Sequence, residues 1–80
     1  MADKYDLRDW VIEALTANGK KGTIVDVCRF IWEKYENELK ASGPFFYTWQ
    51  YNVRSVATEL RKTGTMKPAN VSPQGVWELF

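Results

Sequence analysis

The stretch from Thr48 to Lys62, TWQYNVRSVATELRK, constrains the fold of this chain more than any other segment. Its apolar residues recur at spacings of three and four, which predicts a helix with one buried stripe. The stripe consists of Trp49, Val53, Val56, Ala57 and Leu60. The opposite face carries Tyr51, Arg54, Ser55, Thr58 and Lys62. None of these outward residues is a carboxylate, whereas a solvated helix face usually mixes both charges. We therefore interpret this segment as a recognition helix for a negatively charged, polar partner.

The length and composition fit one domain that covers residues 1–80, with an ordered core from about residue 6 to residue 80. A hydrophobic content of 45% and twelve aromatic residues argue against disorder. No apolar run approaches the ~18 residues of a membrane span, so no membrane contact is predicted. The N-terminus lacks an apolar signal core and Cys28 has no second cysteine to pair with, which favours a cytoplasmic protein.

The charge of the chain is distributed unevenly along its length. The net charge is +1, which is low for a nucleic-acid-binding protein. Residues 1–19 carry two cations and four anions, a net charge of −2. Residues 20–46 carry five cations and four anions, a net charge of +1, and residues 47–80 carry four cations and two anions, a net charge of +2. The most positive part therefore contains the candidate recognition helix.

A first helix is predicted with Asp6 as its N-cap and with Asn18-Gly19 as its C-terminal stop. Its apolar side consists of Leu7, Trp10, Val11, Ala14 and Leu15, and Ile12 sits toward the polar side.

A second helix is predicted from a capping box at Thr23–Asp26 to about Leu39 or Lys40, with a very short strand before it as an open possibility. Its buried stripe consists of Ile24, Val27, Cys28, Ile31, Trp32, Tyr35 and Leu39. Ion pairs on its outer face are expected for Arg29–Glu33, Lys34–Glu38 and Glu36–Lys40. Phe30 points away from the stripe, so it is either covered by another segment or exposed.

After Gly64 the pattern changes from helical to alternating, which indicates strands. Residues 65–67 and 76–80 are predicted to pair as an antiparallel β-hairpin around the loop PANVSPQG. Lys67 and Asn70 lie on or near this loop, together with Ser72 and Gln74, and all of them can reach phosphates.

Catalysis is not predicted. The chain has no histidine, the commonest general base, and no nucleophile elbow or phosphate-binding glycine loop. Cys28 lies on an apolar stripe, where core packing explains it better than reactivity. We expect no metal, no cofactor and no small-molecule substrate.

The outer face of the third helix has the chemistry of a DNA-reading surface, although a solvated amphipathic helix is the simpler interpretation. An α-helix fits the major groove, where arginine can bind guanine edges and glutamine can bind adenine. Arg54 lies mid-face, and Gln50 and Tyr51 lie near the N-terminal end that usually enters the groove. The hydroxyl groups suited to phosphates or bases belong to Tyr47, Ser55 and Thr58, and the cations suited to phosphates are Arg61 and Lys62.

Three helices followed by a β-hairpin, with a polar outer face on the third helix, resemble the winged helix-turn-helix domain. The combination of Leu60-Arg61-Lys62-Thr63-Gly64 with Gly75-Val76-Trp77-Glu78-Leu79 is similar to winged helices of prokaryotic regulators and of domains attached to bacterial restriction endonucleases. The resemblance implies that helix three enters the major groove and that the wing touches the DNA backbone or minor groove. It nominates Gln50, Tyr51, Arg54, Ser55, Thr58 and Lys62 on the helix, and Lys67 and Asn70 on the wing. The connection from Lys40 to Tyr47 is longer than the tight turn of the simplest members.

The sequence therefore predicts a mostly α (α+β) winged-helix domain that binds double-stranded DNA, as a transcription regulator or as the DNA-reading module of a larger protein. The alternative is a protein-interaction module, with a protein partner or a second copy of the chain docking on Phe30, Ile12 and the acidic first helix.

Overall fold

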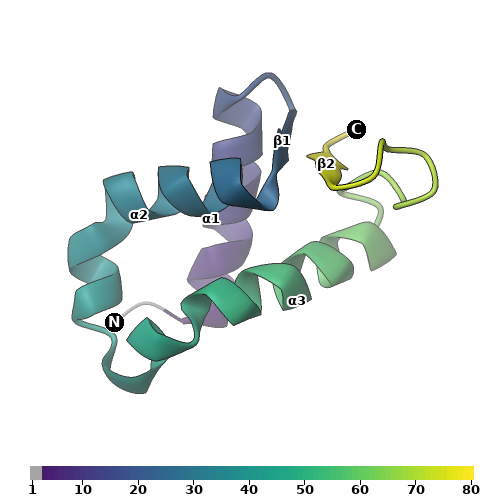
Figure 1. Ribbon diagram of the computed structural model, residues 1–80. Coiled ribbons are helices and arrows are strands. Elements are labelled where there is room, and N and C mark those ends of the chain that lie inside the picture. The colour runs from purple at the N-terminus through teal and green to yellow at the C-terminus, as the bar shows by residue number, and fades with distance from the viewer. Residues whose placement is uncertain (1–2) are drawn as a thin grey trace.

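The structure is a computed structural model that describes residues 3–80 (Figure 1). Its elements are α1 (Lys4–Ala17), β1 (Lys21–Thr23), α2 (Ile24–Lys40), the 3-10 helix η1 (Gly43–Tyr47), α3 (Trp49–Lys62) and β2 (Val76–Glu78). The strands and the loop before β2 lie at the C-terminal end of α3, and the connection between α2 and α3 lies at the opposite end (Figure 1). The chain is a small, mostly helical domain with a two-stranded antiparallel sheet, which confirms the predicted class in this coarse form.

The core forms where the apolar stripes of the three α-helices meet. Every stripe residue predicted for the first and third helices is buried, with exposed fractions between 0% and 9%. The predicted phase of both helices is therefore confirmed. Met66 and Trp77, which follow α3 in the sequence, complete the core.

The start of α1 differs from the prediction. Asp3 is the N-cap, and its Oδ1 accepts hydrogen bonds from the backbone N–H groups of Tyr5 at 2.9 Å and Asp6 at 3.1 Å. Asp6 bonds back to the N–H of Asp3, so the two aspartates form a capping box. The assignment of Asp6 as the cap was wrong, because a cap and its N3 partner can both be aspartate. The predicted stop is confirmed by Asn18 at the C-cap and by the left-handed φ of 74° at Gly19.

The predicted boundaries of α2 are confirmed, as are its capping box at Thr23 and the short strand before it. The helix bends at Tyr35, where the backbone leaves helical geometry. The ring of Tyr35 stacks on Trp10 of α1, with ring centroids 4.0 Å apart. Its hydroxyl donates to the carboxylate of Glu13 at 2.8 Å.

The charged side chains of α2 pair differently from the prediction. Of the three expected pairs, Glu36–Lys40 forms at 2.7 Å and the other two are not formed between these described residues. Lys34 instead binds Glu13 of α1, because α1 packs beside this part of α2 and offers a carboxylate already held by Tyr35. Phe30 and Ile12 are half-buried against the core, so the reading of Phe30 as covered is the one confirmed.

The predicted β-hairpin after α3 is not formed as such. β2 pairs antiparallel with β1, in the register Lys21–Glu78, Gly22–Trp77 and Thr23–Val76. Residues 65–67 pair with the end of the chain only through an isolated bridge between Met66 and Leu79. Two backbone bonds flank it, from the N–H of Lys67 to the oxygen of Glu78 at 2.8 Å and from the N–H of Phe80 to the oxygen of Thr65 at 3.5 Å. Pro68 follows directly and has no N–H to continue the ladder. Within residues 65–80 the two-stranded wing that the sequence predicted is therefore not formed.

The long connection between α2 and α3 is filled by η1, with Pro44 in its first turn. Phe45 and Phe46 of this element pack partly against the core, beside the start of α3. In the region covered by the structure, every helix is too short or too polar to cross a membrane.

Candidate nucleic-acid interface

The side of α3 opposite its buried stripe is open to solvent. Arg54, Gln50, Thr58 and Lys62 are exposed, and Ser55 is half-buried. Tyr51 exposes 77% of its surface, and Tyr47, just before the helix, exposes 84%. The structure thus brings the predicted helix residues together on one face.

The N-cap residue of α3 is Thr48. The side chain of Thr48 makes no cap hydrogen bond to the first turn of the helix. Instead its hydroxyl and carbonyl oxygens accept from the side-chain amide of Asn52 at 3.3 Å and 3.0 Å. The positive end of the helix dipole is therefore not offset by a side-chain acceptor.

The exposed face of α3 is positively charged. Arg54 and Lys62 have no carboxylate within 4.0 Å among residues 3–80. Glu59 borders this face, beside Arg54 and Lys62 in the same shallow depression. Its carboxylate binds the ammonium of Lys4 at 2.8 Å, and this hydrogen bond lowers the pKa of Glu59. The one acid at the edge of the face is thus ionised and offset by a cation from α1.

Two of the cations predicted to contact DNA have partners inside the chain. Arg61 is half-buried, and its Nε donates to the backbone oxygen of Lys67 at 3.3 Å. The ammonium of Lys67 lies 3.6 Å from the carboxylate of Glu78. Both side chains hold the segment after α3 in place, in addition to any contact with a ligand.

The other residues predicted to contact DNA differ in how accessible their polar atoms are. The hydroxyl of Thr58 donates a hydrogen bond to the backbone oxygen of Arg54 at 3.2 Å, so toward a ligand it can act only as a hydrogen-bond acceptor. Asn70 is exposed in the loop of residues 68–75. Ser72, named beside it, is buried, and its hydroxyl has no partner among the described atoms.

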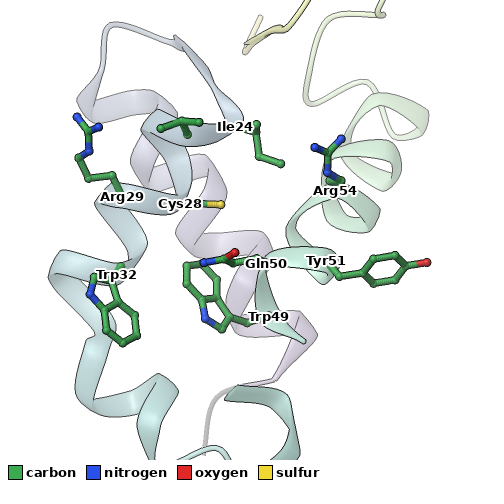
Figure 2. A pocket seen from close by; sticks show the side chains of 9 residues that line it. Ile24, Cys28, Arg29, Trp32, Trp49, Gln50, Tyr51 and Arg54 are labelled. Atoms are coloured by element: carbon green, nitrogen blue, oxygen red, sulfur yellow. The ribbon is translucent and has the colours of Figure 1, made fainter. Parts of the chain in front are cut away.

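A pocket of about 530 Å³ lies between the first turns of α2 and the first half of α3 (Figure 2). The α3 residues that line it include Gln50 and Arg54. Figure 2 shows Arg29 of α2 and Arg54 of α3 on its opposite sides, with Cys28 between them. Burial raises the pKa of the Cys28 thiol, against the opposing effect of Arg54, so the thiol is neutral at pH 7.

The α2 side of this pocket was not predicted from the sequence. Arg29 was assigned to an ion pair with Glu33, and Cys28 and Trp32 were assigned to the core. Cys28 and Trp32 are only half-buried. The available signal was the four-residue spacing of Ile24, Cys28 and Trp32, which forms a second apolar row at the edge of the buried stripe.

No protein-family model, curated protein or solved structure matches this chain. The winged-helix resemblance therefore stays a prediction. Within residues 3–80, no three His, Cys, Asp or Glu side chains gather in a way that would hold a metal ion. A functional assignment has to rest on the geometry and charge of the exposed surfaces.

Proposed function

We propose that this domain binds double-stranded DNA through the exposed face of α3, as a regulator or as the DNA-reading module of a larger protein. The observation that carries the proposal is the pair of exposed cations, Arg54 and Lys62, on a face whose bordering Glu59 is already neutralised by Lys4. Such a face attracts the phosphate backbone, and an α-helix has the width to enter the major groove.

The residues divide into base-reading and phosphate-binding roles. Gln50 and Tyr51 lie in the first turn of α3, and Arg54 follows one turn later. These three side chains meet base edges, with the Arg54 guanidinium suited to guanine. Lys62 lies two turns beyond Arg54, where the helix leaves the groove and meets phosphates.

The flanking residues bind the DNA backbone. Tyr47 and Ser55 supply hydroxyl groups at the edges of the face, and Asn70 supplies an amide from the loop after α3. Arg61 and Lys67 support these contacts by fixing where that loop leaves the helix. The loop acts as a backbone contact without the paired strands of a wing.

The alternative function, protein interaction through Phe30 and Ile12, has weaker support. Both side chains are half-buried against the core and do not form a free apolar surface. The face of α3 carries two exposed cations, Arg54 and Lys62, without an ion-pair partner among residues 3–80, so DNA binding is the function that we put forward.

An NMR titration of the ¹⁵N-labelled domain with a short random-sequence duplex, at low and at moderate salt, tests the proposal. We expect chemical-shift changes in residues 47–62 and 67–75 that fade as salt is added. Arg54→Ala should reduce these changes, whereas Lys34→Gln, which removes one cation on the α1–α2 side, should not. The absence of shifts at low salt would refute DNA binding. Shifts centred on α1 and Phe30 would show that DNA binds a face other than that of α3.

A further inference from the structure

A groove lined with aromatic residues runs beside the exposed face of α3. The pocket of about 530 Å³ adjoins a second one of about 450 Å³, and the two share Trp32, Trp49 and Gln50 in their walls. Tyr47 borders the far end of this surface, and Arg29 and Arg54 border the near end. We call this surface the aromatic groove.

The aromatic groove carries positive charge and no negative charge. Arg29 and Arg54 line the first pocket, and no carboxylate lines either pocket. Arg29 also borders a separate hollow that Asp26 and Glu33 line. Arg29 and Arg54 come from different helices and stand on opposite sides of the first pocket (Figure 2). Neither has an ion-pair partner within residues 3–80. An occupant that matches this charge is an anion.

The walls of the aromatic groove offer flat rings. Trp32 is half-buried, and its ring is parallel to that of Trp49 within 7°, with centroids 6.3 Å apart. Phe46 lies 6.2 Å from Trp32, and Tyr47 packs edge-on against Phe46. Of these rings Tyr47 is exposed, Trp32 and Phe46 are half-buried, and Trp49 is buried. Accessible aromatic rings beside cations are the arrangement with which proteins bind unpaired nucleotides, because each nucleotide has a base that stacks and a phosphate that needs a cation.

We propose that the aromatic groove binds an unpaired nucleobase, while Arg29 and Arg54 hold the phosphates of the same strand. The domain then prefers DNA with an unpaired segment over continuous duplex. This inference rests on the proposed function, because Tyr51 and Arg54 line both the groove and the depression on the duplex-binding face. That continuity favours one nucleic-acid ligand across both surfaces over an acidic peptide in the groove. The pocket volume lies within the roughly 300–1,000 Å³ of sites that enclose small ligands.

Fluorescence anisotropy of the whole chain with three labelled DNAs tests the preference. The probes are a 16-base-pair duplex, the same duplex with a three-nucleotide bubble, and a single-stranded dT12. We expect the bubble to bind at least about fivefold more tightly than the duplex. Tight binding of dT12 as well would assign the groove to free single strands, and tight binding of the bubble alone would assign it to junctions.

Arg29→Gln is the informative variant, because Arg29 lies outside the duplex-binding face. It should remove most of the bubble preference and leave duplex affinity within about twofold, whereas Lys34→Gln on the same helix should change neither. At the other end of the groove, Tyr47→Phe should keep the preference and Tyr47→Ala should lose it, because stacking needs the ring and not the hydroxyl.

The outcomes separate this inference from the proposed function. Equal affinity for duplex and bubble, with duplex binding intact, would overturn the groove assignment alone. Binding of dT12 without binding of duplex would support the groove and refute duplex recognition. Equal losses of duplex and bubble affinity in Arg29→Gln would show that Arg29 is a general phosphate contact and would also overturn the inference. Binding of none of the three DNAs would overturn both proposals.

Discussion

The Nε of Arg61 donates a hydrogen bond to the backbone carbonyl oxygen of Lys67 at 3.3 Å. This contact joins the last turn of α3 to the segment that follows it. The N–H of Lys67 in turn donates to the oxygen of Glu78 in β2 at 2.8 Å. Arg61 therefore fixes the position of the loop relative to the exposed face of α3, and the side chain of its neighbour Lys62 is exposed to solvent.

Replacing these two neighbours should separate stability from binding. Arg61→Ala should lower the free energy of unfolding by about 1 kcal/mol, because it removes a half-buried hydrogen bond from a charged donor. Lys62→Ala should leave stability within about 0.5 kcal/mol and reduce the salt slope of duplex binding by about one. Urea unfolding and a salt series of binding constants measure the two effects. An Arg61→Ala domain as stable as the wild type would show that the contact contributes nothing.

Trp49 and Tyr51 form a matched pair of aromatic residues on opposite faces of α3. Trp49 exposes 4% of its surface and Tyr51 exposes 77%. Trp49→Ala should cost about 3–5 kcal/mol of stability as a large-to-small change in the core. Tyr51→Ala should change stability by less than about 0.5 kcal/mol and weaken DNA binding. Thermal unfolding of both variants checks the phase of the helix, and similar melting temperatures for the two would contradict it.

Asp3 should contribute more to the stability of α1 than its place near the terminus suggests. Its side chain accepts two backbone hydrogen bonds at the start of the helix. Asp3→Ala should lower the free energy of unfolding by about 1 kcal/mol, whereas Asp3→Asn or Asp3→Ser should retain most of it, because both can cap a helix. Chemical unfolding of the three variants measures this. Equal stability of all three would mean that the cap is not formed in solution.

Glu13 should make the free energy of unfolding depend on pH. Hydrogen bonds from Lys34 and then Tyr35 lower the pKa of Glu13 below its ordinary value of 4.5. Because the folded-state pKa is lowered, the ionised carboxylate stabilises the fold above pH 4.5. That stability is lost as the pH falls through the folded-state pKa.

Melting temperatures of the wild type and Glu13→Gln between pH 7 and pH 3 check this dependence. Glu13→Gln should be less stable at pH 7 and should lose less stability on acidification. Asp26 and Glu59 also have lowered pKa values, so part of the acid sensitivity should remain in the variant. Parallel curves for the two proteins would contradict the role of Glu13.

The helices were predictable because their signals are local. The stripe that contains Trp49 and Leu60 follows from spacing within one segment, and so does the capping box at Thr23. The partner of β2 was not predictable in this way, since the choice between residues 65–67 and β1 depends on how the chain returns across the core. The alternating pattern favours residues 65–67 because they are the nearest such segment, although Pro68 limits their pairing.

The candidate site was predictable only on the side formed by α3. Arg54 and Lys62 were found because one helix face carried them without an acid. Arg29 was not predicted as a site residue because its spacing of four residues from Glu33 predicts an ion pair on the helix surface. In addition, a pocket between two helices leaves no pattern within either segment. Lys34 was misassigned for the same reason, since its partner Glu13 lies on another helix.

The salt dependence of duplex binding tests the central claim most directly. We would measure the dissociation constant of a random 16-base-pair duplex between 50 and 300 mM salt for the wild type, Arg54→Ala and the control Lys34→Gln. If Arg54 and Lys62 each neutralise one phosphate, the logarithm of the binding constant should fall against the logarithm of salt with a slope of about −2. Arg54→Ala should weaken binding at every salt concentration, by ~1–3 kcal/mol if it also reads a base, and Lys34→Gln should match the wild type. Binding that is absent at 50 mM salt, independent of salt, or equal in wild type and Arg54→Ala would contradict DNA recognition by α3.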